Sequence, residues 1–207
     1  MRTSQTVIAG LAAATALAVS LAGCGSKQTS SPTKSGSATS TTSAASSAPT
    51  SSAAPAQPND YTNLLIQATD INAPVTFTAS PPAQNPNGRP GIATTFSTDD
   101  GSHSIKDTIQ VLADPGAATD ALNAAKDAQG AAIKAPAPNP FNVGTGGTTL
   151  FGKSPDGSKG VLVLLFTEGN AFVTLEFDGP VDAQPPTEFV TDVGQKQDAA
   201  VKKGLGG

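Results

Sequence analysis

The sequence predicts an α+β domain at residues 60–207, with a single antiparallel sheet of about five strands in the order β-β-α-β-β-β-α and helices packed on one face. Apolar residues alternate over 92–96 and 104–113, as in half-buried strands. Turn residues separate three later apolar segments, which favours hairpins. Two other stretches, 114–130 and 185–203, have apolar residues at helical spacing.

The first half of the domain contains two principal strands and one principal helix. Residues 61–68 predict a short helix, and the Pro- and Asn-rich residues 73–90 predict a loop with a short strand at 75–78. In the strand at 104–113, positions 105, 107, 109 and 111 share one face. The helix after it begins at Asp114-Pro115, because Asp caps free amide groups and Pro suits the first helical position, and it ends near Gly130.

The second half contains three strands and the last helix. Residues 136–140, with three prolines, predict a loop before strands at 148–151, 161–167 and 171–178. Residues 161–166 are apolar without alternation, so we expect a central strand that is covered on both faces. Residues 168–170 predict a tight hairpin. The last helix follows Pro185-Pro186, and its buried stripe includes Phe189, Val193 and Ala200.

Residues 1–23 have the pattern of a bacterial export signal. Arg2 supplies a positive charge, and residues 7–21 form an apolar stretch shorter than the roughly 20 residues that span a bilayer. The stretch ends in Leu21-Ala22-Gly23-Cys24, which contains the only cysteine of the chain. A free thiol in an exported protein needs an explanation. The alternative is an ordinary secretory leader that ends in an accidental cysteine.

The tetrapeptide 21–24 resembles the lipobox of bacterial lipoproteins at all four positions. The resemblance implies that Cys24 carries a diacylglyceryl group, that a signal peptidase cuts just before it, and that the new amino terminus is often acylated. Because each buried methylene contributes about 0.8 kcal/mol, two or three acyl chains hold a protein stably on a membrane. We therefore expect a lipid-anchored protein on the extracytoplasmic face of the cell membrane.

The segment after this cysteine has the composition of a spacer. Of residues 25–59, 17 of 35 are Ser or Thr, and none is Leu, Ile, Val, Phe, Tyr or Trp. Such a chain buries nothing that offsets its ordering entropy, so we expect 24–59 to be a disordered linker with a reach of roughly 33 Å. The composition also suggests O-glycosylation, with a bare linker as the alternative. The candidate acceptors are Thr39, Thr41, Thr42 and Thr50.

The charge of residues 60–207 excludes some partners. Nine Lys and Arg against sixteen Asp and Glu give a net charge of −7, the wrong sign for a protein that binds nucleic acid. Anionic membrane surfaces and polyanionic wall polymers are also poor electrostatic partners for such a domain. The expected partners are the membrane, through the anchor, and an envelope protein, lipid or wall component that the sequence does not identify.

Few residues could carry catalysis or bind a metal. His103 is the only histidine, so the usual His-rich or Cys-rich zinc and iron sites are not available, and we expect no metal and no other cofactor. A serine hydrolase would need His103 as its base, but residues 100–104 predict a hairpin turn, in which a polar side chain is exposed. Glu176 and Asp178 do not make a defined acid pair.

Three other patterns are better explained by turns and loops. The glycine-rich residues 144–149 lack the lysine of a phosphate-binding loop and precede a strand rather than a helix. Asp99-Asp100 and the pair Asp156 and Ser158 do not have the spacing of a calcium-binding loop.

The phenylalanines allow two interpretations. Most are expected in the core, but helices that stand off the sheet would leave a pocket for an acyl chain or another lipid. The residues concerned are Phe141, Phe151, Phe166, Phe172, Phe177 and Phe189.

The order of leader, linker and cysteine-free domain, with the segments 62–71, 114–125 and 166–173, resembles the small cell-envelope lipoproteins of mycobacteria and their relatives. Several such domains are sensor-like or have a fold like that of Mog1p and the photosystem accessory protein PsbP. The resemblance implies a non-enzymatic binding or accessory domain and transfers no catalytic residue. A carrier of lipids or lipoglycans is the alternative, and a hydrolase or other enzyme is the third class.

Overall fold

The computed structural model describes residues 60–131 and 133–206 and has the α+β class that the sequence predicts. The export signal, Cys24, the linker and its candidate glycosylation sites lie outside the described residues. The strands are β1 (Phe77–Ala79), β2 (Ala83–Gln84), β3 (Gly91–Thr98), β4 (Ser104–Val111), β5 (Lys134–Pro140), β6 (Thr145–Lys153), β7 (Lys159–Glu168) and β8 (Ala171–Pro180), and the α-helices are α1 (Pro115–Ala128) and α2 (Thr187–Gly204).

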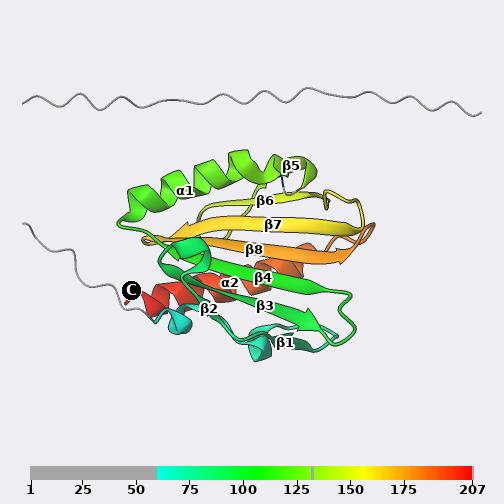
Figure 1. Ribbon diagram of the computed structural model, residues 1–207, viewed down its shortest axis with the longest axis horizontal. Coiled ribbons are helices and arrows are strands. Elements are labelled where there is room, and N and C mark those ends of the chain that lie inside the picture. Colours follow the sequence, from blue (N-terminus) through cyan, green and yellow to red (C-terminus); the bar gives the residue numbers. More distant parts are fainter. Residues whose placement is uncertain (1–59, 132, 207) are drawn as a thin grey trace, which may run out of the picture. The chain divides into compact units, whose positions relative to one another are not determined.

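The strands form one sheet in the order β1-β3-β4-β8-β7-β6-β5, with β2 also paired to β3, and every pairing is antiparallel (Figure 1). The described part of the chain thus has eight strands, and the prediction of about five was wrong. Strand β1 overlaps the short strand expected at 75–78, which the count of about five left out, whereas β2 and β5 lie in segments expected to be loops. The predicted hairpins between β3 and β4 and between β7 and β8 are confirmed.

The prediction that the helices share one face of the sheet was also wrong. Side chains of β7 alternate between two separate cores, because consecutive residues of a strand point to opposite faces. Val163 and Leu165 pack with Leu122 of α1, whereas Leu164 packs with Val193 of α2. The two helices therefore lie on opposite faces, and in Figure 1 α2 passes behind β4 while α1 lies beside β6. The apolar run at 161–166 is covered on both sides, as predicted.

The edge strand β5 has the sequence KAPAPNP, with proline at positions 136, 138 and 140. Proline has no backbone N–H, so inside a sheet it would break the hydrogen-bond ladder, but on an edge it costs little. Pro138 and Pro140 pair in regular register with Leu150 and Thr148 of β6, whereas Pro136 lies where the register shifts between Lys134 and Ala137. At the other edge, β1 and β2 contain only three and two residues.

The chain before β1 packs over the α2 face of the sheet. The helix predicted at 61–68 is replaced by two 3₁₀ turns, at Thr62–Leu64 and Ala68–Asp70. Gln197 of α2 is fully buried and fixes the segment between them. Its Oε1 accepts a hydrogen bond from the Ile66 N–H at 3.1 Å, and its Nε2 donates one to the Leu64 carbonyl at 2.7 Å.

One carboxyl group lies inside this core. Asp107 of β4 is 0% exposed, and neither carboxyl oxygen has a hydrogen-bond partner among the described residues. The strand alternation predicts its face correctly, since Ile105 and Ile109 on either side belong to the same core. Thr94 is its cross-strand neighbour, but the Thr94 hydroxyl donates to the Ser80 carbonyl instead. Burial raises the pKa of Asp107 well above its ordinary value.

Candidate ligand pocket

An apolar pocket of about 390 Å³ opens on the α2 face of the sheet, where three segments distant in the sequence meet. Residues 72–77 form one wall, the adjacent ends of β4 and β8 form the floor, and residues 183–189 at the start of α2 form the other wall. A volume of this size falls within the range of small-molecule sites, roughly 300–1,000 Å³. The pocket is therefore large enough to hold a small ligand or part of a lipid.

Three aromatic rings from different segments line the pocket. Phe189 stacks on Phe77 with ring centroids 6.5 Å apart, and it meets Phe177 edge-on at 6.0 Å. Beside them lies Val75, whose side chain is large, apolar and exposed; its relative solvent accessibility is 48%. Such apolar side chains, left partly open to water at a concave surface, favour a ligand with an apolar body.

The alternation of β8 explains how the pocket receives its aromatic floor. Phe177 points to the α2 face, and its cross-strand partner is Ile105 of β4. Both residues line the pocket. Phe177 and Phe189 are two of the six phenylalanines for which the sequence left a pocket open as an alternative to the core. Phe77 was missed, because its short strand carries little apolar periodicity. By contrast, Phe166 and Phe172 are buried core residues, and Phe141 and Phe151 pack against the core.

His103 lies at the mouth of this pocket, in the turn between β3 and β4 where an exposed side chain was predicted. Hydrogen bonds with Thr98 fix its backbone: the Thr98 N–H donates to the His103 carbonyl at 3.1 Å, and the His103 N–H donates to the Thr98 hydroxyl at 3.2 Å. The ring lies over Gly179, where an added Cβ would be 3.4 Å from Cδ2 and 3.8 Å from Nε2.

A charged carboxylate supports the same turn. Asp100 Oδ1 accepts hydrogen bonds from the Thr98 hydroxyl at 2.6 Å, the Ser102 N–H at 3.0 Å and the Ser102 hydroxyl at 2.8 Å. The bonds from Thr98 and then Ser102 lower the pKa of Asp100 to about 2. The Ser102 hydroxyl also lies 2.8 Å from Nδ1 of His103. This arrangement orients the imidazole ring, but the serine lies between the acid and the histidine, unlike in a hydrolase triad.

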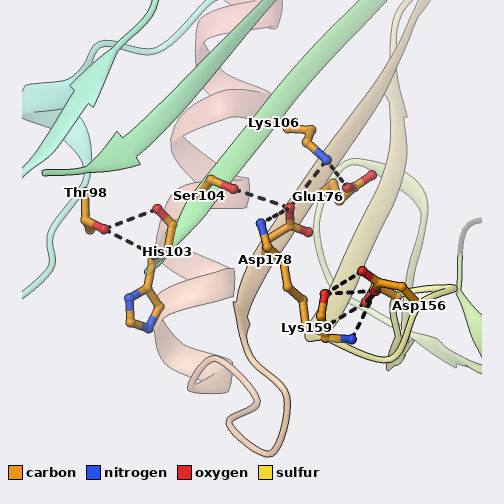
Figure 2. A network of polar contacts seen from close by, with 10 residues as sticks. Thr98, His103, Ser104, Lys106, Asp156, Lys159, Glu176 and Asp178 are labelled. Atoms are coloured by element: carbon orange, nitrogen blue, oxygen red, sulfur yellow. Dashed lines mark hydrogen bonds and ion pairs between the residues drawn. The ribbon is translucent and has the colours of Figure 1, made fainter. Parts of the chain in front are cut away.

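A second polar cluster lies on the opposite face of the sheet. Asp178 follows Phe177 in β8, so its side chain lies on the opposite side of the sheet from the Phe177 ring, where its carboxylate contacts Ser104, Lys106 and Lys159 (Figure 2). Lys106 also pairs with Glu176. Figure 2 shows the His103 ring directed away from this cluster. Glu176 and Asp178 are thus members of an ion network linked by lysines.

Of the remaining sequence candidates, Asp99, Asp100 and Asp156 lie in turns. Asp156 Oδ1 accepts hydrogen bonds from the hydroxyl of Ser154 and from the N–H and hydroxyl of Ser158, which lower its pKa to about 2. Residues 144–149 were expected to be a loop before a strand, but β6 already begins at Thr145 and has a β-bulge between Thr145 and Thr148. Within residues 60–131 and 133–206, no group of three or more His, Cys, Asp or Glu is placed to hold a metal ion.

Comparison of the chain with known proteins finds no matching protein-family model and no matching curated sequence. In the described part of the chain, no helix has the length and apolar character needed to cross a membrane.

Proposed function

We propose that this chain is a bacterial lipoprotein, anchored through Cys24 outside the cytoplasmic membrane, whose folded domain binds an amphipathic molecule without catalysing a reaction. The observation that carries the binding role is the aromatic pocket formed by Phe77, Phe177 and Phe189. The anchor rests on the lipobox-like residues 21–24. The position of His103 supports the non-enzymatic role. The Ser102 hydroxyl lies between Asp100 and His103, whereas in a serine hydrolase the histidine lies between the acid and the serine nucleophile.

The anchor is tested by replacing its sulfur. We expect Cys24→Ser to move the protein from the membrane fraction to the soluble extracytoplasmic fraction, because the serine cannot be alkylated and the acyl chains that supply membrane affinity are lost. Fractionation, together with labelling by a clickable palmitate analogue, measures the change. Ser26→Ala, two residues away, is the control and should remain labelled and membrane-bound. An unlabelled wild-type chain would contradict the proposed anchor.

The pocket is tested by filling it. Ala183 is exposed and lines the pocket, so Ala183→Trp would place an indole where the ligand is expected. We expect this variant to lower the affinity for 1-O-dodecylglycerol at least about tenfold, because each methylene kept out of the pocket forfeits about 0.8 kcal/mol. Calorimetry on the chain from residue 24 onward, with Cys24→Ser, measures the affinity.

The matched control fills a different hollow. Ala68 lines a separate pocket of about 370 Å³ between the 3₁₀ turns and β3, so Ala68→Trp adds the same side chain elsewhere. Its affinity for the probe should equal that of the parent chain. Equal losses in the two variants would contradict binding in the aromatic pocket.

The second candidate function is a carrier of lipids or lipoglycans, and the same pocket favours it. A carrier should retain its cargo during purification without detergent. Native mass spectrometry of the chain released from its own bacterial envelope would then show an added lipid mass that Ala183→Trp abolishes. Repeated preparations without added mass would contradict carriage and leave reversible binding of an amphipathic molecule as the proposed function.

A further inference from the structure

The ring of His103 offers a hydrogen-bonding group at the mouth of a pocket whose lining is mostly apolar. Its Nδ1 is in contact with the Ser102 hydroxyl at 2.8 Å, whereas the residues described in the structure provide no partner for Nε2. Nε2 is on the side of the ring that lies over Gly179, which itself lines the pocket. A ligand whose apolar part occupies the pocket would therefore bring its polar end close to this nitrogen.

The hydrogen bonds of the turn determine which nitrogen of the neutral ring carries the proton. The Ser102 hydroxyl has one hydrogen and two neighbours at 2.8 Å, Asp100 Oδ1 and His103 Nδ1. A hydrogen bond to a charged carboxylate is the stronger of the two choices, so the serine donates to Asp100. The Ser102 oxygen must then accept from Nδ1–H. Neutral His103 is therefore protonated on Nδ1, and Nε2 is a hydrogen-bond acceptor.

The charges around the pocket restrict the polar end of the ligand. None of the described residues that line the pocket is Lys or Arg, and the adjacent turn contains the carboxylates Asp99 and Asp100. Lys106 and Lys159 are engaged on the other face of the sheet. An anionic head group would meet negative charge without a counterion, whereas a neutral hydroxyl can donate a hydrogen bond to Nε2.

We propose that the pocket selects a neutral, single-chain amphiphile with a hydroxylated head, and that His103 Nε2 accepts a hydrogen bond from a hydroxyl of that head. This inference rests on the proposed function, because it assigns the ligand class of the same pocket. His103 is thus a specificity residue, positioned by Ser102 and Asp100, rather than a catalytic one.

The test compares two ligands with the same alkyl chain, one with free hydroxyl donors and one in which those hydroxyls are methylated. 1-O-Dodecylglycerol has free hydroxyls, and its dimethyl ether has the same chain without a donor; dodecanoate is the anionic comparison. Calorimetry on the chain from residue 24 onward with Cys24→Ser should show the glycerol compound binding about 3- to 10-fold more tightly than the ether, and more tightly than dodecanoate. His103→Phe retains an aromatic ring but no acceptor, so it should bind the two neutral ligands equally.

Two further variants separate recognition from structure. His103→Gln supplies an amide oxygen and should recover part of the preference, whereas Ser102→Ala frees the ring and should reduce it. In all three variants the affinity for the ether should remain that of the parent chain, which shows an intact pocket. Equal binding of both neutral ligands by the parent chain, tighter binding of dodecanoate, or a preference that survives in His103→Phe would overturn the role of His103. Failure of the parent chain to bind any probe would instead overturn the proposed pocket function, and the inference with it.

Discussion

The free energy of unfolding is expected to fall as the pH rises above about 4, and Asp107→Asn is expected to remove most of that fall. Burial keeps the pKa of Asp107 well above its ordinary value, so the folded chain retains a proton that the unfolded chain releases near pH 4. The folded state then binds more protons than the unfolded state, and stability decreases with pH until the folded pKa is reached. The slope approaches about 1.4 kcal/mol per pH unit.

Other carboxylates act in the opposite direction at lower pH. The pKa values of Asp100 and Asp156 are lowered to about 2 by their hydrogen bonds, so the stability that these groups contribute is lost as the pH falls from about 4 toward 2. Stability should therefore be greatest in mildly acidic solution. The pKa of Asp198 is raised by partial burial and by Glu168, so Asp198 adds a smaller decrease on the same side as Asp107.

Urea denaturation from pH 3 to pH 9 measures this profile. In Asp107→Asn the same side-chain shape carries no ionisable proton, so the variant should gain about 1.4 kcal/mol over the parent for each pH unit in which the parent retains its proton. Asp198→Asn is the comparison and should leave most of the slope in place. A parent chain whose stability is constant or rises between pH 5 and pH 8 would show that Asp107 finds a partner or a water molecule in solution.

The second large effect is expected at Gln197. Replacing it with Leu preserves the apolar stem but removes both hydrogen bonds to the segment before β1. The Ile66 N–H and the Leu64 carbonyl would then be buried without partners, and an unsatisfied buried group costs about 1–3 kcal/mol. We expect Gln197→Leu to lower the free energy of unfolding by roughly 2–4 kcal/mol.

Denaturant unfolding and native-state hydrogen exchange measure this loss, and exchange should increase first at residues 60–73. Gln195→Leu is the matched control, because it makes the same change on the exposed side of α2 and should alter stability by less than about 0.5 kcal/mol. Equal stability of Gln197→Leu and Gln195→Leu would contradict the role assigned to the buried amide.

Local patterns predicted most of the described strands and both α-helices. Asp114 caps α1 as expected, with Oδ1 accepting a hydrogen bond from the Ala117 N–H at 2.8 Å. Alternation placed residue 107 on the buried face of β4. It could not predict that this acid has no partner, because the surrounding groups come from other elements of the fold.

The two main errors have different physical causes. The run at 161–166 was recognised as covered on both faces, which by itself requires a helix or other cover on each side, so helices confined to one face were inconsistent with it. The strand β5 was missed because proline normally marks loops; only the knowledge that a segment lies at the sheet edge makes three prolines acceptable in a strand.

The ligand pocket was only partly predictable. The phenylalanine content raised the possibility, and the turn at 100–104 placed His103 correctly at an exposed position. His103, Phe77 and Phe189 come from three different segments, and any two of these residues are 26 to 112 positions apart in the sequence. Local periodicity cannot predict that such distant segments meet.

The prolines at the edge of the sheet affect how neighbouring molecules on a membrane would associate. Molecules held by lipid, as proposed for this chain, share a two-dimensional plane in which neighbours collide often. A border strand with free amide groups would invite strand-to-strand polymerisation between such neighbours. Here one border, β5, carries three prolines, which have no backbone N–H, and the other is broken into pieces too short to act as a template. Dense coverage of the membrane is therefore compatible with individual molecules that remain separate and keep their pockets free.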